Sequence, residues 1–109
     1  MLIPKSPAIR SKALRDSAKG EDCTLNIAGV CSYDSATTVL CHLPGEGKGT
    51  AYKVDDFYAV FGCEACHRWL DGYQGTEEER LFYTIRAWRR TIRRWVEMGL
   101  IQVKGVKAA

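Results

Sequence analysis

Long hydrophobic runs are missing from this sequence, and several residue types are scarce. Its 109 residues include three prolines, two histidines and two methionines, and no apolar stretch exceeds a few residues. A membrane-spanning helix needs about 20 consecutive apolar residues, so we expect no membrane segment and no membrane partner. The first residues also lack the apolar core of a secretory signal peptide, and we therefore expect a cytoplasmic protein.

Strong net charge is absent as well, but the charge that is present lies unevenly. Hydrophobic residues make up 46% of the chain and charged residues 27%, which is typical of one globular domain. The net charge is only +3. From position 80 to position 107 there is one acid, Glu97, against eight basic residues: Arg80, Arg86, Arg89, Arg90, Arg93, Arg94, Lys104 and Lys107. Together with a basic N-terminus, this distribution favours a polyanionic partner.

Cysteine is abundant, with five in the chain. An odd number in a reducing compartment argues against a disulfide framework and favours zinc. Cys63 and Cys66 have the C-x2-C spacing of a metal-binding turn, and no thioredoxin-like strand and helix precede them to support a redox pair. Cys23 and Cys31 provide a second pair, with Cys41 as a competing ligand and buried free thiols as the simpler alternative. We predict a structural zinc held by Cys23, Cys31, Cys63 and Cys66.

The clearest predicted element is a long amphipathic helix over residues 76–98. Thr76 and Glu79 have the spacing of a capping box, and Gly99 provides a stop. Apolar residues recur at helical spacing, which favours a packed core face for Trp88 and Trp95 over a surface that stacks on bases. Five arginines favour contact with a nucleic-acid backbone over a merely solvated face: Arg86, Arg89, Arg90, Arg93 and Arg94.

The other predicted elements are short. We expect a basic helix within 10–18, strands over 24–27, 37–43 and 101–103, and a helix that opens at Cys66 and ends near Leu70. Residues 55–61 fit either a strand or a helical turn. The glycine-rich segment after Pro44 lacks the ending of a P-loop, but its Lys48 and the nearby Lys53 are candidates for phosphate contact.

Both histidines stand beside cysteines. His42 ends a predicted strand, and His67 directly follows the C-x2-C pair. Asp71 lies four residues after His67, so the two share one helix face and can hold a divalent metal whose remaining ligands are waters. Such an open site suits catalysis, although an ordinary helix histidine and a helix-end carboxylate give the same pattern.

In combination these residues resemble a known motif. A strand ending in His42, a loop, and then Cys63-x2-Cys66-His67-x3-Asp71 is similar to the HNH, or ββα-metal, nuclease motif on a treble-clef zinc scaffold. The resemblance implies that His42 is the general base and that His67 and Asp71 hold a catalytic metal such as Mg²⁺, Mn²⁺ or Zn²⁺.

A longer pattern, over roughly residues 10–75 and weakly over the C-terminal helix, resembles the YbcO-like nucleases of phages and prophages. Cys41 stands where HNH nucleases commonly have a metal-binding Asp or His, which makes it a candidate third ligand. The stretches that carry the resemblance are Ala13–Gly20, Asp22-Cys23, Ile27–Cys31, Leu40–Leu43 and Ala65–His67.

We therefore expect an α+β treble-clef domain. Residues 1–22 would form a basic arm, residues 23–75 the zinc-stapled HNH-like unit, and residues 76–109 the basic helix and tail. The resemblance implies a metal-dependent endonuclease that acts on DNA, branched or single-stranded forms included, in the cytoplasm of a bacterial host. The alternatives are a non-catalytic zinc module that binds nucleic acid, and an interaction protein that forms a homodimer through the C-terminal helix.

Overall fold

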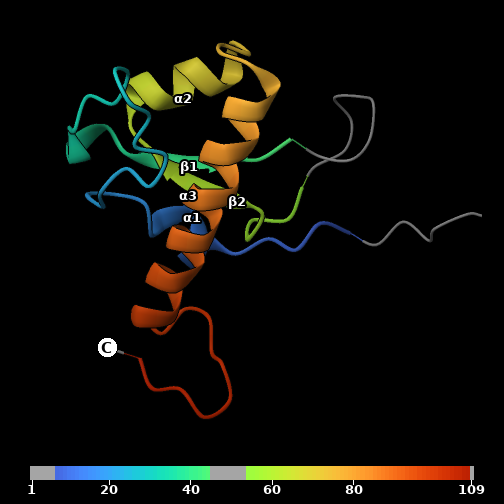
Figure 1. Ribbon diagram of the computed structural model, residues 1–109. Coiled ribbons are helices and arrows are strands. Elements are labelled where there is room, and N and C mark those ends of the chain that lie inside the picture. The colour runs from blue at the N-terminus through green and yellow to red at the C-terminus, as the bar shows by residue number, and fades with distance from the viewer. Residues whose placement is uncertain (1–6, 45–53, 109) are drawn as a thin grey trace, which may run out of the picture.

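The structure is a computed structural model that describes residues 7–44 and 54–108 (Figure 1). It combines a two-stranded sheet with helices, so the predicted α+β class is confirmed. Lys48 and Lys53 lie outside the described residues. Within the described part, no helix is long and apolar enough to cross a membrane. The elements are α1 (Lys12–Asp16), the 3₁₀ turn η1 (Ser35–Thr37), β1 (Val39–His42), β2 (Ala59–Gly62), α2 (Glu64–Asp71) and α3 (Glu77–Glu97).

Strands β1 and β2 pair antiparallel, with Val39 opposite Gly62 and His42 opposite Ala59. All four residues of β2 are buried, because both faces of this strand are covered. In β1 only Cys41 is fully buried, and His42 is exposed. Successive side chains of a strand point to opposite faces, so Cys41 enters the core while His42 faces outward.

Helix α3 packs across β2 (Figure 1). Trp95 is fully buried against Phe61, and its indole Nε1 donates to Ser17 Oγ over 2.7 Å. Trp88 is half-buried and donates from Nε1 to the Phe57 carbonyl over 2.9 Å. The predicted core role of both tryptophans is therefore confirmed.

Local sequence sets the ends of the two longer helices. Thr76 and Glu79 form the predicted capping box, which begins α3 at Glu77. Helix α2 begins at Glu64, two residues before the predicted start, because the Cys63 side chain acts as its N-cap and accepts from the Cys66 amide. Arg80 Nη1 donates to three successive backbone carbonyls, those of Tyr73, Gln74 and Gly75. These hydrogen bonds fix the turn between α2 and α3.

Two predicted strands are wrong. Residues 24–27 form a bend, in which the Thr24 and Leu25 amides both donate to the Phe61 carbonyl and Asn26 has φ of 42°. Residues 101–103 form no strand either. The ambiguous segment 55–61 becomes a strand only from Ala59 onward, where it can pair with β1.

Candidate functional site

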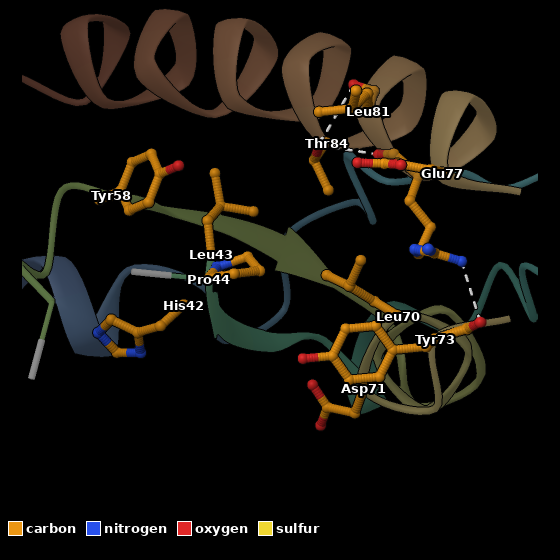
Figure 2. A pocket seen from close by; sticks show the side chains of 11 residues that line it. His42, Leu43, Pro44, Tyr58, Leu70, Asp71, Tyr73, Glu77, Leu81 and Thr84 are labelled. Atoms are coloured by element: carbon orange, nitrogen blue, oxygen red, sulfur yellow. Dashed lines mark hydrogen bonds between the residues drawn. The ribbon is translucent and has the colours of Figure 1, made fainter. Parts of the chain in front are cut away.

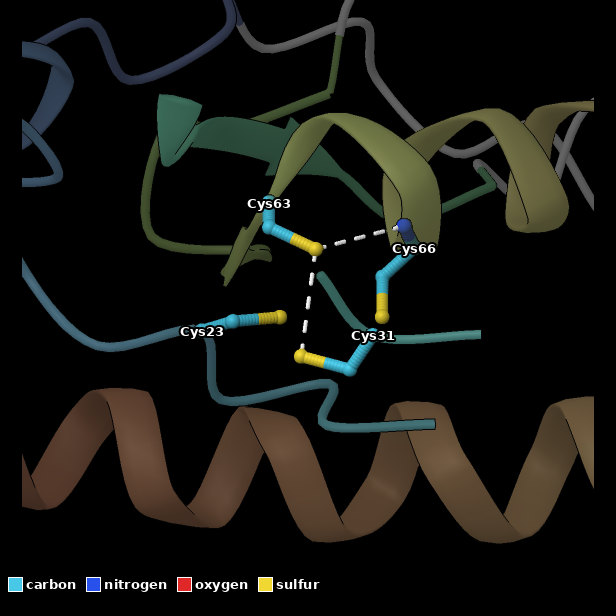
Figure 3. Close-up of side chains that lie close together, drawn as sticks. All are labelled: Cys23, Cys31, Cys63 and Cys66. Atoms are coloured by element: carbon cyan, nitrogen blue, oxygen red, sulfur yellow. Dashed lines mark hydrogen bonds between the residues drawn. The ribbon is translucent and has the colours of Figure 1, made fainter. Parts of the chain in front are cut away.

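Four cysteine side chains converge between α2 and the bend at residues 23–31 (Figure 3). Their sulfur atoms all lie within 4.8 Å of one another, and the Sγ atoms of Cys31 and Cys63 are 3.9 Å apart. A zinc ion bonded to four sulfurs at about 2.3 Å would separate neighbouring sulfurs by about 3.8 Å. The cluster therefore has the donor set and the size of a tetrahedral zinc site, formed by the four cysteines that the sequence pairs.

Backbone amides point at these sulfurs. The amides of Asn26, Ile27 and Cys66 donate to the Sγ atoms of Cys23, Cys66 and Cys63, each over 3.4 Å. Such bonds stabilise thiolates, which are the form that binds a metal.

Proton sharing within the cluster also favours the thiolate form. The Cys66 thiol lowers the pKa of Cys23 to about 5, and the same contact raises the pKa of Cys66. A divalent cation would displace the shared protons. Four protein ligands leave no open position, so this site suits a structural metal.

Cys41 stands apart from the cluster. Its side chain is buried among Leu25, Val60 and other core residues, and burial raises the pKa of its thiol to about 12. A Cβ at position 62 would lie 2.6 Å from the Cys41 Sγ, so Gly62 is required for the close approach of β2 to this thiol. Cys41 is therefore a protonated core residue at neutral pH.

A cleft of about 560 Å³ opens between the end of β1, the end of α2 and the first turns of α3 (Figure 2). His42 and Asp71, which the sequence assigns to one site, both line it. Figure 2 shows them on one side of the cleft, with Leu81 and Thr84 of α3 on the other and the His42 ring turned away from Asp71. Tyr58, Tyr73 and Arg80 are also among the lining residues.

The His42 ring is held by a carboxylate that the sequence did not single out. His42 Nε2 lies 2.9 Å from Oδ1 of Asp56, and the Asp56 side chain has no exposed surface. Its other oxygen accepts from the Ser11 amide at 2.7 Å and from Arg15 at 2.8 Å, and Arg10 lies 3.4 Å away.

Burial by itself would raise the pKa of Asp56. The Ser11 amide, His42 and the two arginines outweigh burial and hold that pKa well below its ordinary value. Asp56 therefore stays ionised and fixes His42 through Nε2, which leaves Nδ1 free of this contact.

His67 and Asp71 form the second pair. His67 Nε2 lies 3.1 Å from Asp71 Oδ2, as the spacing of four residues predicts, and Asp71 is two-thirds exposed. Of the two, Asp71 lines the cleft, and His67 is not among its lining residues. Among the described residues, the four cysteines are the one group of three or more potential ligands close together, so the described part of the chain offers two ligands here.

The predicted arginines divide into two sets. Arg86 donates to the carbonyls of Leu25 and Asn26, and Arg94 pairs with Glu21 at 2.5 Å. These two arginines therefore make contacts within the fold. The other three of these five arginines are exposed: Arg89, Arg90 and Arg93.

Comparison with known proteins agrees with this arrangement. A family model described as "Putative nuclease YbcO" matches residues 12–100. The chain belongs to the YbcO family. This confirms the family to which the sequence pattern pointed, and the family relation extends into α3, beyond the motifs that carried the resemblance.

Two YbcO relatives are 41% identical to this chain over 59 residues: "Putative nuclease YbcO" of Escherichia coli K12 and "Putative nuclease ybcO" of Enterobacteria phage 82. In each case the match covers 53% of this chain and 62% of the relative. The solved structure of a "putative bacteriophage protein" from Escherichia coli K-12 superposes with a TM-score of 0.67 at 28% identity. That match covers 80% of this chain and 100% of the other.

Proposed function

We propose that this protein is a metal-dependent endonuclease that hydrolyses phosphodiester bonds of DNA. The observation that carries the proposal is the cleft lined by both His42, fixed by a buried carboxylate, and Asp71 of the His67–Asp71 pair. The printed names of the YbcO relatives support a nuclease. The zinc cluster, the β1–β2 hairpin and α2 correspond to an HNH-like treble clef within residues 23–75.

Hydrolysis of a phosphodiester needs a base that takes a proton from the attacking water. His42 is suited to this role because Asp56 holds Nε2 and leaves Nδ1 as the nitrogen that accepts the proton. The Asp56 carboxylate also stabilises the positive charge that the ring then carries, as carboxylates do in other acid–base pairs. Asp56 is thus a positioning residue for His42.

The negative charge that develops on phosphate needs compensation. His67 and Asp71 offer one nitrogen and one oxygen ligand, a set that Mn²⁺, Mg²⁺ and Zn²⁺ accept when waters complete the shell. A metal bound there would act as a Lewis acid toward the phosphate. The buried Cys41 thiol takes no part in this pair. The exposed Arg90 and Arg93 would contact the substrate backbone.

Cleavage assays on zinc-loaded protein test the proposal. Plasmid and branched DNA are incubated with Mg²⁺, Mn²⁺, Ni²⁺ or Zn²⁺, and His42→Ala is compared with wild type. Because a positioned base contributes about 10²–10⁴-fold, cleavage by His42→Ala should fall by that factor, with zinc content and folding unchanged. Asp71→Ala should lose cleavage that added metal partly restores, and Gln102→Ala, in the C-terminal tail, serves as the control.

Two outcomes would contradict the proposal. If wild-type protein cleaves neither DNA nor RNA with any of these metals, the exposed arginines and the zinc support a non-catalytic nucleic-acid-binding module instead. If His42→Ala releases the tightly bound zinc and unfolds, His42 has a structural role.

A further inference from the structure

The first half of α3 carries an apolar patch that the fold does not cover. The core-facing residues of this helix are Ala87, Thr91 and Trp95. Leu81, Phe82 and Ile85, by contrast, are 53%, 58% and 63% exposed. Three large apolar side chains within five residues form a contiguous surface, and such patches mark interaction sites more often than isolated exposed residues do.

Charges of opposite sign flank this patch along the helix. Glu78, Phe82, Ile85 and Arg89 follow one another at spacings of four, three and four residues, which places them on one face. Both charged residues are exposed. The face therefore presents an acid, two apolar side chains and a base in that order.

This order is complementary to itself when two such helices run antiparallel. A twofold axis between Phe82 and Ile85 sets each Phe82 opposite the partner's Ile85 and each Glu78 opposite the partner's Arg89. A parallel pair would set like charges opposite each other. The acids at one end also make this face a poor surface for nucleic acid.

We propose that this face of α3 binds a second copy of the chain in an antiparallel helix pair. The contact is isologous, so one patch serves both protomers and the assembly closes as a dimer. Two neighbouring side chains pack against Phe82. The guanidinium of Arg86 lies 5.2 Å from the centroid of the Phe82 ring, and the ring of Tyr83 packs against it edge-on. Arg90 lies about 100° round the helix from Arg89 and stays outside the seam.

The dimer would also place two clefts beside one helix pair, because Leu81 belongs to the patch and also lines the cleft. If the cleft is a nuclease site, which rests on the proposed function, one dimer carries two cutting sites. The pairing itself does not depend on that function and is tested without DNA.

Sedimentation of the full zinc-loaded chain over a range of concentrations tests the pairing. Wild type should form a dimer as concentration rises. Glu78→Arg and Arg89→Glu should each weaken it about tenfold, because two symmetry-related ion pairs become repulsive at once. The double variant Glu78→Arg/Arg89→Glu should restore the dimer, and an equal mixture of the two single variants should form a heterodimer.

Lys104→Glu, in the C-terminal tail, makes the same charge change as Arg89→Glu; it is the matched control for that variant and should dimerise like wild type. Ile85→Glu should yield a folded monomer with its zinc retained. The proposal is overturned if wild type stays monomeric up to about 1 mM, where association would be worth only about 4 kcal/mol. It is also overturned if a dimer forms that the charge exchange neither weakens nor restores, since another surface then holds it.

Discussion

At the scale of single residues, Asp56 connects parts of the chain that are far apart in sequence. Its carboxylate meets Arg10, Ser11 and Arg15 of the N-terminal segment and His42 of β1. The orientation of the proposed base therefore depends on residues that precede it by about 30 positions. A charge this deeply buried is tolerated because donors surround it.

Cys41, next to His42 in the chain, has a different role and yields a pH prediction. Burial raises the pKa of its thiol from the ordinary 9.0 to about 12. Between these values the unfolded chain has lost a proton that the folded protein keeps. The stability that Cys41 contributes is therefore complete below pH 9.0 and is lost as pH rises toward 12.

We expect the free energy of unfolding of wild type, minus that of Cys41→Ala, to fall by up to about 1.4 kcal/mol per pH unit in that window. Urea unfolding of both proteins at about pH 8 and about pH 10.5 measures this difference, in which the other ionisations largely cancel. A difference that is independent of pH would show that the thiol is solvated or already ionised.

At the scale of elements, α3 carries arginines of two kinds, some engaged within the fold and some exposed. Arg86 and Arg94 are engaged with Leu25, Asn26 and Glu21, whereas Arg90 and Arg93 are exposed. Charge counting in the sequence treats all of them alike, but only the exposed ones are available to a phosphate backbone.

Replacing Arg90 and Arg93 together by Gln should weaken DNA binding equally for all sequences, because phosphate contacts carry no base information. The slope of log K against log salt should become shallower by about 0.9 for each lost contact with duplex DNA. Fluorescence anisotropy titrations at several salt concentrations measure both. Lys104→Gln removes one charge from the C-terminal tail, away from α3, and is the control. An unchanged slope in the double variant would mean that these arginines are only solvated.

Elements with local signals are the ones that the sequence predicts well. The capping box at Thr76 and the apolar spacing of α3 lie within the helix itself, and the cysteine and histidine spacings predict the cysteine cluster and the His67–Asp71 pair. The bend at Thr24–Ile27 was mistaken for a strand because its amides bond to Phe61, a distant partner.

Asp56 was missed for a similar reason. It is one of 13 acidic residues in the sequence, and only the pairing of β1 with β2 reveals its burial beside His42. Sequence spacing carries no signal for a contact of this kind.

At the scale of the whole molecule, the core is divided in two. One cluster surrounds Cys63 and Cys66 and includes Leu25, and the other surrounds Phe61 and Trp95. The cysteine site lies within the first cluster, so a metal there would join the bend at residues 23–31 to α2. Small domains with little core commonly depend on such a link.

We therefore expect about one tightly bound zinc per chain by elemental analysis, since four thiolates make one closed site. Removing the metal with a chelator should unfold the protein, and Cys63→Ser should lose both metal and fold, because binding and folding are coupled. Circular dichroism follows the unfolding. Cys41→Ser changes a cysteine outside the cluster and should keep the zinc. A chain that stays folded without metal would refute this role for the cluster.

The cysteine cluster also has a consequence for the tolerance of this fold to insertions. Cys31 and Cys63 are 32 positions apart, so a metal bound by both would close a long loop of the chain. The entropy lost on closing a loop grows only with the logarithm of its length, and doubling the length costs about 0.6 kcal/mol. Extra residues between Pro44 and Val54 would thus cost little stability. The length of that stretch can therefore change while the rest of the fold stays the same.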